Sequence, residues 1–173
     1  MDKKEMNEEK PTRKQNRLNY YDYSSCGAYF LTVCTSKRIN YFWLEAPSDV
    51  GASIARPLDP QNIRLSKYGK IADEAVKNIS GTYKALSVDH YVIMPDHIHL
   101  LLSIRADEYG RPMVAPTVSR VVQQMKGYVT KRIGTSIWQK SFYDHVIRNK
   151  EDYEAHIKYI YENPFGEKPD IIK

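Results

Sequence analysis

The sequence predicts an α+β fold in which helices pack on one face of an antiparallel sheet. Runs rich in β-branched and aromatic residues alternate with segments whose apolar residues repeat every three or four positions. Their order is strand, helix, strand, strand, helix, strand, helix. A short turn joins the two consecutive strands, which makes them antiparallel neighbours. This order is typical of a ferredoxin-like split βαβ sandwich, and 173 residues suit one such domain.

The first half of the chain predicts one strand and one helix. Residues 28–35 (AYFLTVCT) are apolar and rich in strand-forming residues, which indicates a central strand. Residues 45–63 contain three prolines and no sustained period, so we expect a loop or an irregular insertion there. Ser66 can cap a helix that ends near Ile79, because apolar residues then recur on one helical face.

The middle of the chain predicts a hairpin. Residues 86–94 (LSVDHYVIM) and 97–104 (HIHLLLSI) have the composition of two strands, and Pro95-Asp96 between them is a turn signal. Residues 105–116 contain Gly110, Pro112 and Pro116 and are expected to form another loop.

The C-terminal third predicts a helix, a strand and a last helix. Thr117 can cap the first helix, which ends near Ile133. Its apolar residues recur at helical spacing: Val118, Val121, Val122, Met125 and Val129. Residues 142–148 indicate a strand, and 151–162 a final helix that Asn163-Pro164 ends.

Charge and composition narrow the class of protein. The chain has 26 basic and 21 acidic residues, and a net charge of +5 favours polyanionic partners. Residues 1–16 are charged and polar, so we expect a flexible tail before a domain over 17–165 and a short tail over 166–173. We find no apolar stretch as long as a membrane span and no signal peptide, which predicts a cytoplasmic protein.

Two histidines at the start of the strand at 97–104 are the most specific chemical feature. Side chains alternate along a strand, so His97 and His99 share a face that Ile98 does not. At a rise of about 3.3 Å per residue, the two imidazoles start about 6.6 Å apart and can lean onto one cation. Two histidine ligands leave positions open for water or substrate oxygens. The spacing alone leaves a second interpretation open, a pair of surface histidines on a solvated face.

The surrounding sequence resembles a known family. Residues 91–102 read YVIMPDHIHLLL and resemble the YVxMPNHxHLL motif of HUH-type single-tyrosine transposases, specifically the REP-associated (RayT-like) branch. Asp96 stands where that family usually has Asn, and either residue suits the turn. Further similar segments follow the family's order: residues 23–35, Gly69-Lys70-Ile71, Met125-Lys126-Gly127-Tyr128, residues 137–148 and residues 159–164.

The resemblance implies metal-dependent cleavage of single-stranded DNA near hairpins. In such enzymes the histidine pair binds Mg²⁺ or Mn²⁺, and a tyrosine hydroxyl attacks phosphorus to leave a 5′-phosphotyrosine link and a free 3′-OH. The implied partner is single-stranded or hairpin DNA, with no membrane, in a bacterial, nucleoid-associated setting. A homodimer is one assembly that the sequence leaves open.

Fourteen tyrosines compete for the role of nucleophile. Periodicity places Tyr153 and Tyr161 on the expected core-facing stripe of the last helix, and Tyr29 inside a central strand. Tyr128 lies at the margin of its helix's apolar stripe, from which its hydroxyl can reach a cleft. Periodicity leaves the choice open, and the family's Lys-x-Tyr motif then selects Tyr128 as the catalytic partner of His97 and His99.

The resemblance also implies a third metal ligand and DNA contacts. Related enzymes commonly carry Gln or Asn four residues after the nucleophile, but Arg132 occupies that place after Tyr128 and has no lone pair to donate. Gln124, one turn before Tyr128, is therefore the candidate third ligand. Lys126, Arg132 and Arg148 are candidate DNA-binding residues, and each can equally be a solvated surface charge.

Two other functions remain open from the sequence. The first is a host-adopted relative that binds hairpin DNA or RNA and no longer cuts. The second is a metal-free RNA-binding module of ferredoxin-like fold, with aromatic residues on the sheet as a stacking platform. The histidine pair argues against this module, because a stacking platform favours aromatic residues at those positions.

Overall fold

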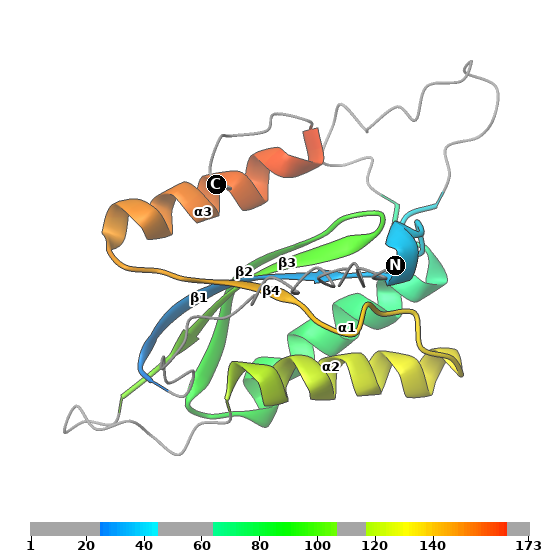
Figure 1. Cartoon of the computed structure of the whole chain (residues 1–173), viewed down its shortest axis with the longest axis horizontal. Helices are drawn as coiled ribbons and strands as arrows, with labels where there is room; N and C mark the ends of the chain where they lie inside the picture. The colour runs from blue at the N-terminus through cyan, green and yellow to red at the C-terminus, as the bar shows by residue number, and fades with distance from the viewer. Residues whose placement is uncertain (1–24, 45–63, 107–116, 166–173) are drawn as a thin grey trace, which may run out of the picture.

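The structure is a computed structural model that describes residues 25–44, 64–106 and 117–165. Its four strands form one sheet in the order β2-β3-β1-β4, and all neighbours are antiparallel (Figure 1). The strands are β1 (Gly27–Cys34), β2 (Leu86–Ile93), β3 (His97–Ile104) and β4 (Tyr143–Val146). The helices are α1 (Lys67–Thr82), α2 (Val118–Ile133) and α3 (Lys150–Glu162). The predicted α+β class with an antiparallel, ferredoxin-like sheet is confirmed.

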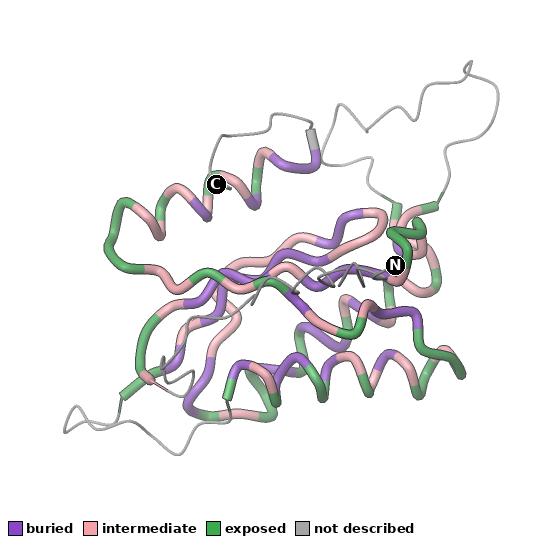
Figure 2. The backbone as a smooth tube through the Cα atoms, in the orientation of Figure 1, coloured by how far each residue is buried: buried purple, intermediate pink, exposed green. Residues whose placement is uncertain are grey.

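Helices α1 and α2 cover one face of the sheet and enclose the main core (Figure 1). Alternate residues of the two central strands point into this core, because side chains of a strand alternate between the faces. These residues are Tyr29, Leu31 and Val33 of β1 and Ile98, Leu100 and Leu102 of β3, each fully buried. Figure 2 shows the central strands buried, while α2 alternates between buried and exposed positions.

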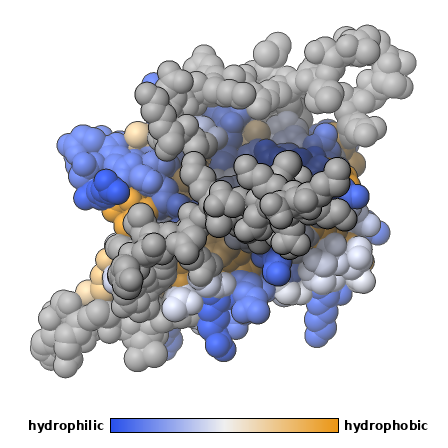
Figure 3. Space-filling model, viewed as in Figure 1, coloured by the Kyte–Doolittle hydropathy of each residue, from blue (hydrophilic) through white to orange (hydrophobic). Residues whose placement is uncertain are grey.

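Helix α3 covers the opposite face, which corrects the prediction that the helices share one face (Figure 1). Phe30 and Leu101 point to this side and form a second, smaller core with Ile160 of α3. The central strands therefore bury apolar residues on both faces, as strands between two helical layers do. In Figure 3, hydrophilic side chains lie on the visible end of α3 and on the outward side of α2, with hydrophobic residues between the layers.

Local capping signals set the helix starts. The Ser66 hydroxyl accepts hydrogen bonds from the backbone N–H groups of Tyr68 and Gly69, and the Thr117 side chain caps α2 as predicted. The N-cap of α3 is Asn149, whose side chain accepts from the N–H of Asp152. Strand β4 is shorter than the predicted 142–148.

Some predictions lie outside the described residues. These are the two tails, the insertion at 45–63 and residues 107–116 of the predicted loop. Within the described ranges, no helix combines the length and apolar character needed to cross a membrane.

Candidate functional site

The histidine pair lies on the face of β3 that α3 covers. The Nε2 atoms of His97 and His99 converge to 3.0 Å. Each ring is held through its other nitrogen: Nδ1 of His97 bonds to the Asp96 carboxylate at 2.6 Å, and Nδ1 of His99 to the Thr32 hydroxyl at 2.9 Å. The structure thus brings the two imidazoles together, as their spacing predicts.

The surroundings of the pair favour a neutral His99 imidazole and an ionised Asp96 carboxylate. His99 is buried, and burial together with the neighbouring His97 lowers the pKa of His99 well below its usual value. Burial alone would raise the pKa of Asp96, but the hydrogen bond from His97 and the charges of His97 and Arg38 hold it below its usual value. His99 is therefore neutral near pH 7, as a metal ligand must be, and Asp96 is ionised.

These residues fit a divalent cation. Two ligand atoms at right angles, each about 2.1 Å from one cation, lie about 3 Å apart. The separation of 3.0 Å between the Nε2 atoms matches that arrangement. A metal-bound histidine usually donates its other N–H to an oxygen, and Asp96 and Thr32 offer those oxygens here.

In this structure Tyr128 lies apart from the histidine pair, although the sequence motifs select it as the catalytic partner of His97 and His99. It lies on α2 and packs against the core on the far side of the sheet from α3. Its hydroxyl donates to Glu74 of α1, a bond that raises the pKa of Tyr128. Arg132 lies over the Tyr128 ring and contacts the same Glu74 carboxylate at 3.4 Å. The sheet separates this group from His97 and His99.

The other predicted site residues are also away from the histidines or otherwise engaged. Gln124 is exposed on α2, on the same far side as Tyr128. The Lys126 ammonium donates to the carbonyls of Gln139 and Ser141, each at 2.9 Å, so it holds the connection to β4 in place. Arg148 is exposed just after β4.

Tyr159 of α3 is the tyrosine that lies against the histidine pair. Its ring meets the His99 imidazole edge-on, with centroids 5.0 Å apart and an interplanar angle of 72°. Phe30 stacks on His99 at 5.1 Å and also meets Tyr159 edge-on at 5.7 Å. The rings of Phe30 on β1 and His99 on β3 thus fix the position of the Tyr159 side chain.

Asn163 lies four residues after Tyr159, at the end of α3, and its N–H donates to the Tyr159 carbonyl. Its side chain is buried, and the amide Nδ2 has no hydrogen-bond partner within the described ranges. Both residues belong to the segment 159–164 that resembles the family, but neither is among the site residues predicted from the sequence. The available signal was spacing, because Asn follows Tyr159 at the position where Arg132 follows Tyr128. Tyr161, predicted on the core stripe, is 61% exposed and lies beside His90.

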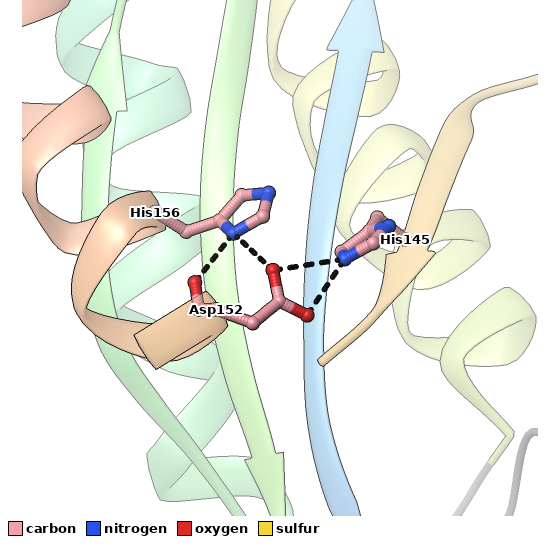
Figure 4. A group of neighbouring side chains, drawn as sticks. All are labelled: His145, Asp152 and His156. Carbon is pink, nitrogen blue, oxygen red and sulfur yellow. Dashed lines mark hydrogen bonds and ion pairs between the residues drawn. The ribbon is translucent and has the colours of Figure 1, made fainter. Parts of the chain in front are cut away.

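A second cluster joins β4 to the first turns of α3 (Figure 4). The Asp152 carboxylate accepts from Nε2 of His145 at 2.9 Å and from the Arg148 N–H at 3.0 Å, and Nδ1 of His156 lies 3.2 Å away. Nδ1 of His156 also donates to the Asp152 carbonyl at 2.8 Å, which places the proton on that nitrogen. A protonated nitrogen cannot bind a metal, so the cluster is a hydrogen-bonded anchor of α3 in this arrangement.

The sequence is similar to a named transposase and to a protein without an assigned function. Over 82 residues the chain is 30% identical to the REP-associated tyrosine transposase of Escherichia coli (strain K12). The matched segment covers 47% of this chain and 46% of that protein. A Haemophilus influenzae protein whose name assigns no function is 27% identical over 171 residues, 88% of each chain. The matched segment thus spans less than half of the named transposase.

The structural comparison agrees on the fold. The chain resembles the solved structure of a REP-associated tyrosine transposase bound to a REP hairpin, with a TM-score of 0.54 and 23% identity. The match covers 86% of this chain and 73% of that chain. No family model matches the sequence. These relatives confirm the resemblance to the REP-associated tyrosine transposases that the sequence motifs predict.

Proposed function

We propose that the protein is a transposase-like endonuclease and strand transferase that cleaves single-stranded DNA next to hairpins. The observation that carries the proposal is the contact between Tyr159 and His99, beside the convergent Nε2 atoms of the pair. The resemblance to the REP-associated transposases supports the substrate class, since one such relative was solved bound to a REP hairpin.

His97 and His99 would hold Mg²⁺ or Mn²⁺ through Nε2, and Asn163 would add its side-chain oxygen. Asn163 is a candidate for this role because it lies one helical turn after Tyr159 on the same helix and an amide oxygen can bind a hard cation. When bound, such a cation stabilises the negative charge that develops on a phosphodiester during cleavage.

Tyr159 supplies the nucleophile in this proposal. Its hydroxyl oxygen forms a bond to phosphorus while the bond from phosphorus to the 3′ oxygen breaks. The phenolic proton leaves, and the 3′ oxygen departs as a 3′-OH. The downstream strand stays attached through a 5′-phosphotyrosine link, which keeps the energy of the broken bond. Another 3′-OH can reverse the step, so joining needs no nucleotide cofactor.

The test is the polarity of a covalent adduct. A single-stranded oligonucleotide with a hairpin, taken from DNA beside the protein's own gene, is labelled at either end and incubated with protein and Mn²⁺. We expect the 3′ label to migrate with denatured protein and the 5′ label to appear on a shorter free strand. The same sequence as a full duplex is expected to give no adduct. Tight hairpin binding without an adduct would instead support the host-adopted relative.

A further inference from the structure

The segment between β1 and the loop that follows has an unusual backbone next to the histidine pair. Lys37 and Arg38 have φ values of 54° and 57°, in the left-handed region that residues with a Cβ rarely adopt. Both side chains are exposed, so packing in the core does not require this conformation. Rare backbone conformations of this kind cluster at functional sites.

The segment is bonded to the turn that precedes His97. The Thr35 N–H and hydroxyl both donate to the Asp96 carbonyl at 2.9 Å. The N–H groups of Tyr41 and Phe42 donate to the Pro95 carbonyl, each at 3.0 Å. These bonds hold the left-handed residues in place beside the site.

The result of this geometry is the position of the Arg38 guanidinium. Its Nε contacts one Asp96 oxygen at 2.7 Å, and its Nη1 lies 2.9 Å from the Cys34 sulfur. The other Asp96 oxygen bonds to Nδ1 of His97. One carboxylate therefore orients both the imidazole of His97 and the guanidinium of Arg38.

The rest of the guanidinium is available to a ligand. The Arg38 side chain is 48% exposed, and its remaining N–H groups have no partner within the part of the chain that the structure describes. A guanidinium held through Nε presents its outer N–H groups as a planar fork, which matches two oxygens of a phosphate.

We propose that Arg38 is a phosphate-binding residue of this site. Its outer N–H groups bind one backbone phosphate of the DNA strand that reaches the histidine pair. Asp96, which contacts both Arg38 and His97, fixes the position of the guanidinium relative to the imidazole. The identity of the ligand as a DNA strand rests on the proposed function. The arrangement also gives a task to Asp96, because an ionised carboxylate can pair with Arg38 while it orients His97.

The test locates the phosphate that Arg38 contacts, without metal and without cleavage. The hairpin oligonucleotide is made with one neutral methylphosphonate at each single-stranded position in turn. Binding to wild type, Arg38→Ala and Lys37→Ala is measured by fluorescence anisotropy in EDTA. We expect Arg38→Ala to weaken binding to unmodified DNA about tenfold. At one position the methylphosphonate should weaken wild-type binding by a similar factor and leave Arg38→Ala unaffected.

Lys37→Ala is the matched control, since it removes a neighbouring exposed cation from the same segment. At the position that Arg38 contacts, the methylphosphonate is expected to weaken binding by Lys37→Ala by the same factor as binding by wild type. Arg38→Gln, which keeps a long polar side chain, replaces Arg38→Ala if the melting temperature of the alanine variant falls. Additive losses at every position would overturn the role of Arg38 even if wild type forms the covalent adduct. If one methylphosphonate weakens binding by wild type but not by Arg38→Ala, and no covalent adduct forms, the phosphate contact of Arg38 stands and the proposed cleavage is rejected. If wild type does not bind the DNA, both proposals are rejected.

Discussion

The phenol ring of Tyr159 lies edge-on to the imidazole of His99, with centroids 5.0 Å apart, although the two residues come from a C-terminal helix and a central strand. The contact exists because α3 crosses the face of the sheet that α1 and α2 leave uncovered. Asn163 follows one turn later on the same helix. In the proposed site, α3 would supply both the Tyr159 hydroxyl and the Asn163 amide oxygen.

Loss of one histidine should weaken metal binding. We expect His97→Ala to lower Mn²⁺ affinity by at least about tenfold in calorimetry without DNA, because Nε2 of His97 is one of two convergent ligands. His90→Ala, on the neighbouring strand beside Tyr161, is the control and should bind Mn²⁺ like wild type. Equal Mn²⁺ affinity of wild type and His97→Ala would contradict the metal site.

The close approach of α1 to the Phe42 backbone should make one glycine intolerant of a side chain. A Cβ on Gly69 would lie 2.1 Å from the Phe42 carbonyl oxygen, so we expect Gly69→Ala to lower the free energy of unfolding by about 1–3 kcal/mol. Gly127 of α2 has open space at that position, and Gly127→Ala should raise it by about 0.5–1 kcal/mol. Urea denaturation measures both, and equal effects of the same sign would refute this packing.

We expect the loss of the Lys126 ammonium to lower the stability of the fold, because this group bonds to the protein's own backbone. Its removal leaves the carbonyls of Gln139 and Ser141 without their donor, so Lys126→Met should cost about 1–3 kcal/mol of unfolding free energy. Lys131→Met, at an exposed position of the same helix, should stay within about 0.5 kcal/mol of wild type. If Lys126 contacts a phosphate instead, stability stays unchanged and the salt dependence of DNA binding falls by about one charge.

The anchor of α3 on β4 should be sensitive to acid. Burial would raise the pKa of Asp152, but hydrogen bonds from His145 and the Arg148 N–H hold it below its usual value. A carboxyl with a lowered pKa stabilises the folded state above its unfolded pKa of about 3.9, and this contribution disappears as the pH falls through the folded value. We expect Asp152→Asn to destabilise at pH 6–7, by an amount that shrinks below about pH 4. A difference in unfolding free energy that is constant from pH 7 to 3 would contradict this.

Local signals in the sequence predict the elements well, because their causes are local. The Ser66 hydroxyl caps α1 through N–H groups two and three residues away, and the turn at Pro95-Asp96 fixes the hairpin of β2 and β3. Which face of the sheet α3 covers is not set by local signals. It depends on Phe30 and Leu101 being as apolar as their neighbours on the other face, which alternation along one strand does not reveal.

The sequence pattern selects Tyr128 over Tyr159 for the same reason, because it does not reveal on which face of the sheet a helix packs. Tyr128 and Tyr159 each lie on a helix and partly against apolar residues, so periodicity treats them alike. What separates them is the side of the sheet on which each helix packs, and only the three-dimensional fold supplies that. One signal in the sequence did separate them: Arg132, four residues after Tyr128, has no lone pair for a cation, whereas Asn163, four residues after Tyr159, carries an amide oxygen.

The most direct test of the account is to identify the tyrosine that carries DNA. Wild type, Tyr159→Phe, Tyr161→Phe and Tyr128→Phe are incubated with the hairpin oligonucleotide and Mn²⁺, and the adduct is digested and mapped by mass spectrometry. The account predicts a nucleotide on the peptide that contains Tyr159, no adduct in Tyr159→Phe despite normal DNA and Mn²⁺ binding, and normal adduct in the other two variants. An adduct that persists in Tyr159→Phe, or that maps to Tyr128, would contradict it.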